Sequence, residues 1–209
     1  MSARRRHLRQ RFDISESFSQ LEESCIPSYC HGNVLAAYTA WWRLFAAASL
    51  AKRKRSLGSV LDFGSGAGEL RHLLTDVTDY EFVEQDDHLA NALMSELPTA
   101  RRRSTDTLPG SRYSTVFALD SLEHNAEPDG VVARITASLK PGGLFVLSGP
   151  TENALYRLGR RIAGFSGHYH ETDIHEIETV TSGHLTLVRR IQGPALLPLF
   201  SVSAWSKAL

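Results

Sequence analysis

The stretch VLDFGSGAGEL, from Val60 to Leu70, decides the fold of this chain. A short apolar run ends in three glycines at alternate positions. Gly64 and Gly66 let the backbone turn tightly and approach a ligand, and Gly68 keeps a following helix close to the strand. The pattern therefore predicts a buried strand, then a ligand-binding turn, then the start of a helix.

The spacing of these glycines excludes two phosphate-binding motifs. A dinucleotide fingerprint, G-x-G-x-x-G, needs a glycine where Glu69 stands, and no Gly-Lys-Ser/Thr follows to make a P-loop. Asp62, at the end of the strand, would repel a pyrophosphate but attract an ammonium group. Glu84 ends the next predicted strand, twenty residues after Gly64. An acid at this place can accept hydrogen bonds from both hydroxyls of a ribose.

The rest of the chain alternates between predicted strands and helices. Residues 1–32 are polar and predicted to be irregular, because Pro27 interrupts any helix there. This alternation favours a doubly wound α/β sheet whose ligand lies at the carboxyl ends of the strands. Strands are predicted over 59–63, 80–84, 101–104, 113–119, 144–148, 185–191 and 199–205, the last two as an antiparallel edge pair, and helices over 33–54, 68–76, 87–97, 128–139, 153–163 and 172–179.

Charge is distributed unevenly although the 209 residues carry a formal net charge of +0. Residues 1–56 contribute +6, residues 57–130 contribute −9 and residues 131–209 contribute +3. A net charge of zero provides no overall positive potential that would attract nucleic acid. The basic beginning instead predicts an N-terminal helical lid over residues 1–56, which folds over an acidic domain of residues 57–209.

Two further features bear on the location of the protein. Cys25 and Cys30 are too few for a disulfide framework or a zinc site, so they indicate reduced thiols in a cytoplasmic protein. The most apolar run, 34–51, contains Arg43 near its middle, which is unfavourable in a membrane span. We expect a core or lid helix here. A helix lying on a membrane surface is the alternative, and peripheral membrane contact stays open.

Four motifs in order give the chain a family resemblance. They are the glycine-rich stretch, the strand ending in Glu84, the LDSLEH stretch from Leu119 to His124, and LKPGGL at 139–144. Together they resemble the motifs of class I S-adenosylmethionine-dependent methyltransferases. Within that superfamily they are most similar to those of ubiquinone-biosynthesis-like O-methyltransferases. The resemblance implies a Rossmann-like seven-stranded sheet in the order 3-2-1-4-5-7-6, with strand 7 antiparallel.

The resemblance also implies where the cofactor S-adenosylmethionine binds. Its methionine part would meet the end of the first strand and the glycine turn, its ribose would meet Glu84, and its adenine would be flanked by Gln85. An acidic residue that meets the adenine amine often follows the third strand, and Ser104, Thr105 and Asp106 stay open for that role. The expected cofactor-binding residues are Asp62, Gly64, Gly66, Gly68, Glu84, Gln85, Asp106 and Leu119.

Catalysis needs a group that removes a proton if the acceptor is an alcohol or a phenol. His124 is the first candidate for this base, and His168 or His170 is expected to close over the substrate. An alternative is a divalent metal held by Asp120, Glu123 and His124 with one of those two histidines, because spacings of three and four residues gather side chains on one helical face. The simpler hypothesis has no metal.

The function predicted from these features is methyl transfer to a small-molecule or lipid-like acceptor, at oxygen. Two alternatives remain. A non-catalytic partner subunit of the same fold would bind the cofactor without turnover. A nucleic-acid or protein methyltransferase is less consistent with Leu119-Asp-Ser-Leu, because the amino-methylation motif Asn/Asp-Pro-Pro-Tyr/Phe is missing there. The acceptor and the oligomeric state are not predicted.

Overall fold

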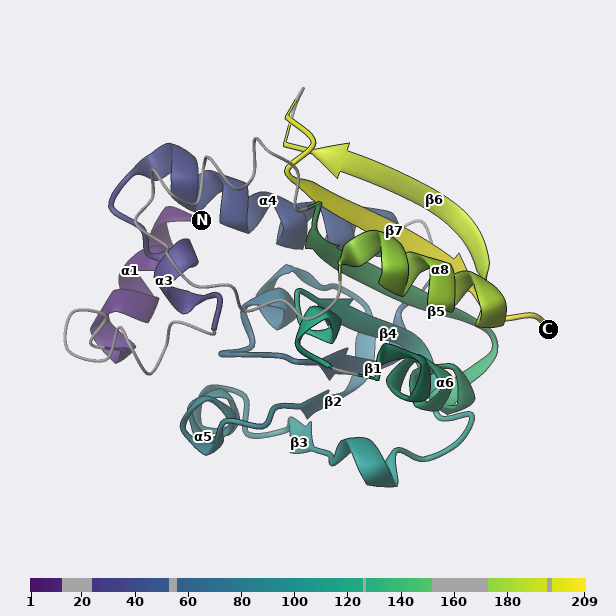
Figure 1. Ribbon diagram of the computed structural model, residues 1–209. Helices are drawn as coiled ribbons and strands as arrows, with labels where there is room; N and C mark the ends of the chain where they lie inside the picture. The colour runs from purple at the N-terminus through teal and green to yellow at the C-terminus, as the bar shows by residue number, and fades with distance from the viewer. Residues whose placement is uncertain (13–23, 53–55, 126, 152–172, 195–196) are drawn as a thin grey trace.

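The computed structural model describes residues 1–12, 24–52, 56–125, 127–151, 173–194 and 197–209. Its described strands form a seven-stranded sheet in the order β3-β2-β1-β4-β5-β7-β6 (Figure 1), which confirms the predicted topology. The first five strands run parallel, and β7 is antiparallel to both β5 and β6. The strands are β1 (Gly58–Phe63), β2 (Val77–Val83), β3 (Arg101–Arg102), β4 (Tyr113–Leu119), β5 (Leu139–Pro150), β6 (Thr186–Gly193) and β7 (Phe200–Ser206).

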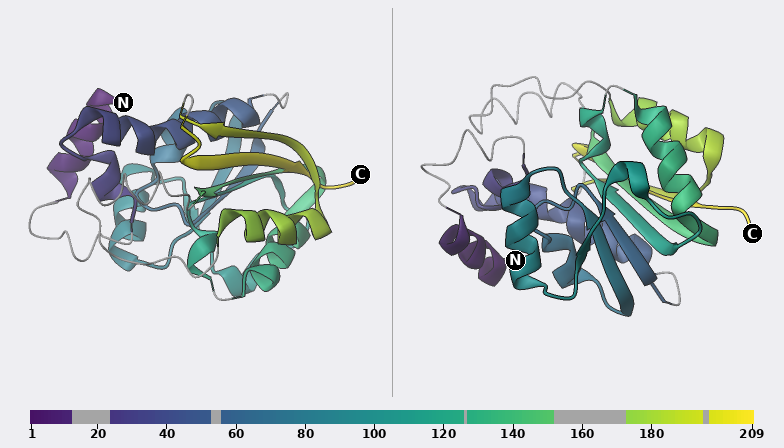
Figure 2. Two further views of the ribbon diagram at one scale, coloured as in Figure 1. Left: turned by 45° about the horizontal axis from the view of Figure 1, so that its top comes forward. Right: turned by 90° about the horizontal axis from the view of Figure 1, so that it is seen from below.

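Helices cover both faces of the sheet (Figures 1 and 2). On one face a core cluster joins the buried sides of α4 and α5 to strand residues such as Phe82 and Phe117. On the other face α6 and α8 pack side by side over a second cluster that contains Phe145. The helices are α1 (Ser2–Arg11), α3 (Ile26–Tyr29), α4 (Val34–Ala51), α5 (Asp87–Glu96), α6 (Pro128–Ser138) and α8 (Ile174–His184), with 3-10 helices η1 (Glu69–Leu73), η2 (Thr105–Thr107) and η3 (Leu122–His124).

Helix α4 begins where the sequence predicted, since the Asn33 side chain accepts hydrogen bonds from the backbone N–H groups of Leu35 and Ala36. It packs against β7, β5 and η1 as a layer of the core. Within the described part of the chain, α4 is also the one helix long and apolar enough to cross a membrane, but 56% of that stretch is buried inside the protein. Its burial agrees with the expected core helix.

Several predicted elements need correction. Residues 2–11 form helix α1 rather than an irregular segment, and its Leu8 is completely buried in the core. The helix predicted over 68–76 is only the 3-10 helix η1, because β2 begins at Val77 and the chain turns through Asp76, which has a positive φ of 58°. Helix α8 extends to His184, beyond the predicted end. The helix predicted over 153–163 lies outside the described residues.

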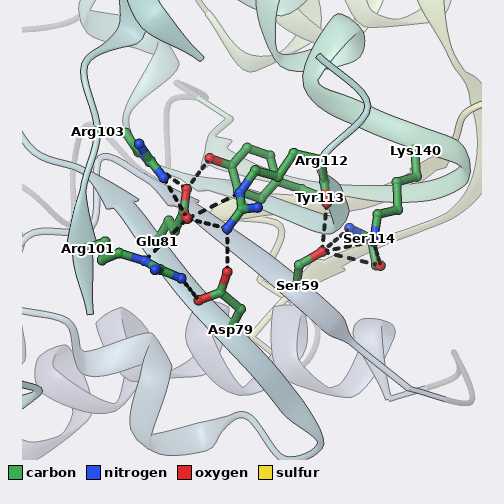
Figure 3. A network of polar contacts seen from close by, with 9 residues as sticks. All are labelled: Ser59, Asp79, Glu81, Arg101, Arg103, Arg112, Tyr113, Ser114 and Lys140. Carbon is green, nitrogen blue, oxygen red and sulfur yellow. Dashed lines mark hydrogen bonds and ion pairs between the residues drawn. The ribbon is translucent and has the colours of Figure 1, made fainter. Parts of the chain in front are cut away.

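A polar network occupies the second face of the sheet at β2 (Figure 3). The fully buried Glu81 accepts hydrogen bonds from Arg103, Arg112 and the Tyr113 hydroxyl, at 2.6 to 3.2 Å. Arg101 Nε lies 3.5 Å from Glu81 Oε1. Burial alone would raise the pKa of Glu81, but these partners lower it to about 2. The carboxylate therefore stays charged and ties three strands together.

Candidate functional site

The glycine turn after β1 is folded back onto the end of β2. The backbone N–H groups of Gly64 and Ser65 both donate to the carbonyl oxygen of Val83, at 2.8 and 3.1 Å. Gly64 has a φ of 71°, and a Cβ added there would lie 2.2 Å from the Cβ of Ser121. Only glycine combines this left-handed backbone with such a close approach to the chain after β4. The turn is therefore fixed between two strand ends.

Glu84 holds the same turn from the other side. Its carboxylate accepts hydrogen bonds from the backbone N–H of Gly66, at 2.7 Å, and of Asp86, at 2.9 Å. The Arg102 side chain donates to the carbonyl oxygens of Glu84 and Gln85, at 2.6 to 3.1 Å, and so fixes the backbone on which the carboxylate is carried. The expected ribose-binding acid thus also orders the glycine turn.

Asp62 lies at the end of β1 and is buried. Burial raises its pKa to about 7, and the nearby charge of Glu84 acts in the same direction. The Tyr80 hydroxyl donates a hydrogen bond to Asp62 Oδ2 at 2.6 Å, which opposes this shift only in part. A carboxyl group in this condition gains from a cationic ligand, because the ligand would compensate its buried charge.

A cavity of about 470 Å³ opens where these groups meet, at the carboxyl ends of β1, β2 and β4. Its volume is within the range of small-molecule sites. One side is formed by the glycine turn, and the other by α3 with the segment that follows β4. Its lining includes Asp62, Gly64, Gly66, Glu84, Gln85 and Leu119 from the predicted set, and Cys25, Ile26, Tyr29, Ser65, Asp86, Asp120, Ser121 and Asn125 besides.

The structure thus brings six of the eight predicted cofactor-binding residues to one cavity. The other two lie elsewhere. Gly68 faces α5, since a Cβ there would lie 2.9 Å from Leu93 Cγ, so it permits helix packing. Asp106 is exposed on η2 and lies 3.3 Å from Arg134, outside the cavity lining.

A buried ion pair closes the far wall of the cavity. Arg43 of α4 contacts the carboxylate of Asp120, which follows β4, and both side chains are more than nine-tenths buried. The Ser148 hydroxyl also donates to Asp120 Oδ1, at 3.1 Å. Burial raises the pKa values of Cys25 and Tyr29 beside this pair, so both stay neutral near pH 7. The wall therefore combines one ion pair with neutral groups.

The predicted helical face of Asp120, Glu123 and His124 is not formed, and that expectation is wrong. Only Leu122–His124 make the 3-10 turn η3, whereas Asp120 precedes it with a positive φ of 51°. Among the residues that the structure describes, no group of three His, Cys, Asp or Glu side chains is placed to hold a metal. His168 and His170 lie outside the described residues, so their proposed roles stay predictions.

His124 is the last residue of η3, which directly follows the cavity-lining Ser121. The sequence did not identify Asp86 or Asn125 as lining residues. Asp86 could have been found as the N-cap of α5, because its side chain accepts from the Leu89 N–H at 3.0 Å at a strand-to-helix turn. Asn125 carries no comparable signal.

A family model described as a methyltransferase domain matches residues 37–187 of this chain. That range includes the glycine turn, Asp62, Glu84 and most of the cavity wall. No curated protein sequence matches the chain.

Solved structures of distant proteins share the fold. The N-methyltransferase NodS from Bradyrhizobium japonicum, in complex with S-adenosyl-l-homocysteine, is 13% identical, with a TM-score of 0.65 over 80% of this chain and 87% of NodS. The Haloferax volcanii complex with the Trm112 methyltransferase activator contains a chain that is 13% identical, with a TM-score of 0.64 over 80% and 90%. The [4+2]-cyclase SpnF is 13% identical, with a TM-score of 0.63 over 81% and 82%. At identities this low, the structural matches show a common fold and nothing more specific.

Proposed function

This chain belongs to the methyltransferase domain family, and from that premise we propose that it uses S-adenosylmethionine to methylate a small-molecule or lipid-like acceptor at oxygen. The observation that carries the proposal is the convergence of the glycine turn, Asp62 and Glu84 on one cavity. NodS, which shares the fold, was solved with the demethylated form of that cofactor.

Two details of the cavity fit such a ligand. The Ser65 hydroxyl is buried, and it has no hydrogen-bond partner within the described residues. At Gly66, which has a φ of 53°, an added Cβ would meet no atom within 4 Å, so the backbone is open at this point. A polar ligand that approaches the turn closely would satisfy the first feature and occupy the second.

The residues of the chain then have distinct roles. Asp62 would hold the ammonium group of the cofactor, Glu84 would accept from the ribose hydroxyls, and Leu119 would pack against its apolar surface. S-adenosylmethionine, when bound, supplies a methyl group already activated on a sulfonium centre. The protein must hold the acceptor oxygen in line with that methyl group. Asp120 is already bonded to Arg43 and Ser148, so the removal of the acceptor proton is assigned to His124.

Two measurements test this proposal. Calorimetry should detect binding of S-adenosylhomocysteine, and the ligand should raise the melting temperature, because only the folded chain has the cavity. Mass spectrometry should then detect transfer of a labelled methyl group to a compound of a cell extract. Absence of cofactor binding would refute the proposal. Binding without transfer to any acceptor would favour the non-catalytic partner subunit.

His124 is tested by substitution. His124→Ala should lower turnover by about 10²–10⁴-fold while cofactor affinity stays near its original value, and a chelator should have no effect. If a metal is used instead, chelation should abolish activity. Full activity of His124→Ala in the presence of chelator would contradict both hypotheses and leave alignment alone as the source of catalysis.

A further inference from the structure

The first turns of α4 expose an apolar face. Val34 is 57% exposed, Leu35 75% and Tyr38 45%. Tyr38 lies four residues after Val34 and three after Leu35, so its side chain neighbours both of theirs on the helix surface. Farther along, α4 is largely buried in the core. Large apolar side chains grouped on the surface in this way are a feature of interaction sites.

Helix α1 places arginines beside this apolar face. Arg5 donates to the carbonyl oxygen of His31 at 2.5 Å, and Arg9 Nη2 donates to that of Cys30 at the same distance, so α1 lies against the segment that enters α4. Arg6 and Arg9 are exposed. A shallow groove of about 220 Å³ runs between Ser2, Arg5, Arg6 and Arg9.

These arginines differ from the others on α1. Arg4 and Arg11 are paired with the carboxylates of Glu69 and Glu96. No carboxylate within the described ranges forms an ion pair with Arg5, Arg6 or Arg9, and the side chains of Arg5 and Arg9 donate to backbone carbonyl oxygens instead. This end of the molecule therefore presents positive charge next to exposed apolar side chains. Figure 1 shows α1, α3 and the start of α4 together at that end.

The face also adjoins the cavity. Helix α3 connects the two along the chain: its Ile26 and Tyr29 line the cavity, and the chain that leaves it reaches the cap of α4 at Asn33 within a few residues. A molecule bound at the face would therefore lie close to the wall of the cavity formed by α3.

We propose that Val34, Leu35, Tyr38, Arg6 and Arg9, together named the docking face, bind the surface of an anionic lipid bilayer. Apolar side chains enter the boundary between headgroups and acyl chains, and neighbouring arginines are attracted to anionic headgroups. The burial of most of α4, including Arg43, means that the helix end lies on the membrane and does not span it.

Two other occupants fit the docking face less well. Nucleic acid offers phosphates to the arginines but no apolar layer for Val34 and Leu35. A symmetric dimer would cover the apolar residues, but an isologous contact would bring the arginines of the two copies together, and like charges repel. An anionic bilayer satisfies both parts of the face at once.

The proposal is tested with the full chain and phosphatidylcholine vesicles, with and without phosphatidylserine, in a co-sedimentation assay. Binding should require the anionic lipid and should weaken as salt is added. Leu35→Ser should weaken binding by about tenfold or more, since it removes most of the apolar side chain that would be buried in the bilayer. Arg6→Gln and Arg9→Gln should each weaken it by about fivefold, which corresponds to about 1 kcal/mol per arginine.

The strand β6 provides matched controls. Val188 is 57% exposed, as Val34 is, and Arg189 beside it is also exposed. Val34→Ser should therefore weaken vesicle binding, whereas Val188→Ser and Arg189→Gln should not. Melting temperatures should show that all variants fold. Equal binding by the variants and controls would overturn the proposal, as would a lack of binding to anionic vesicles.

Two more outcomes would overturn it in favour of another partner. Capture by RNA that depends on the arginines but is unaffected by Leu35→Ser would indicate nucleic acid, and a dimer that Leu35→Ser dissociates would indicate a second copy. The proposal concerns binding and does not depend on methyl transfer. Calorimetry with S-adenosylhomocysteine on the same preparations tests the proposed function separately.

Discussion

Asp62 on β1 and Glu81 on β2 are two buried carboxyl groups on neighbouring parallel strands, and their surroundings differ sharply. Glu81 is paired in register with Leu61, and Asp62 with Phe82, so the two acids lie on opposite faces of the sheet. Each accepts a hydrogen bond of 2.6 Å from a tyrosine hydroxyl. Even so, the pKa of Asp62 is raised to about 7 and that of Glu81 is lowered to about 2.

Arginine accounts for the difference. Glu81 is bonded to Arg103 and Arg112, so its charge is compensated within the protein (Figure 3). Asp62 has no arginine partner within the described residues, and its immediate neighbour is the neutral Tyr80. A buried carboxyl group without a compensating cation is unfavourable for stability. Glu81 therefore has the features of a structural acid, whereas the charge of Asp62 would be stabilised by a cationic ligand.

The largest expected effect comes from removing the structural acid. Glu81→Ala should lower the free energy of unfolding by about 3–5 kcal/mol, because it breaks a buried ion-pair network and leaves its arginines with one acceptor fewer. Urea unfolding followed by circular dichroism measures the change. Asp79→Ala is the matched control, since Asp79 also pairs with Arg101 and Arg112 but is partly exposed. A loss as large from Asp79→Ala would contradict the assignment.

The second-largest effect is expected at Asp62, the acid that would contact the ligand. Asp62→Asn keeps an oxygen that can accept from Tyr80 but removes the charge, so it should weaken S-adenosylhomocysteine binding by about tenfold to hundredfold. The ligand-free variant should unfold no more easily than the original protein at pH 8, because it no longer carries a buried charge. Calorimetry and melting curves on one preparation measure both properties. A variant that binds normally, or that unfolds easily, would show Asp62 to be structural.

The two acids also predict opposite pH dependence of stability. The contribution of Glu81 is complete above its usual pKa of 4.5 and is lost as the pH falls toward 2. The contribution of Asp62 is complete below its usual pKa of 3.8 and is lost as the pH rises toward 7. Between pH 4 and 7, the free energy of unfolding of Asp62→Asn should therefore rise relative to that of the original protein, by about 4 kcal/mol. A constant difference across that range would contradict the raised pKa.

The sequence predicted that the residues around Asp62 would lie together, at the carboxyl ends of the strands. Glycines at 64 and 66 and acids at 62 and 84 occupy fixed places at strand ends, and parallel strands bring their carboxyl ends to one edge. The network of Glu81 was not predicted. Arg103 and Arg112 come from separate segments, and whether they reach Glu81 depends on the register of β2, β3 and β4, which local residue patterns do not determine. Helix α1 was missed for a related reason, because its many arginines find partners only in the folded protein.

The smallest expected effects are those of substituting the two tyrosines, Tyr113 and Tyr80, and they should differ from each other. Tyr113→Phe removes a hydrogen bond to a charged carboxylate, so it should lower the free energy of unfolding by about 1–2 kcal/mol. Tyr80→Phe should have a weaker effect at pH 6, because Asp62 is then largely protonated in the ligand-free protein. Its main consequence should be a higher pKa for Asp62, which moves the onset of S-adenosylhomocysteine binding to higher pH. Unfolding at pH 6 and calorimetry across pH 6–9 measure these effects. Equal destabilisation by the two substitutions, with no shift in the pH dependence of binding, would mean that the tyrosines serve both acids alike.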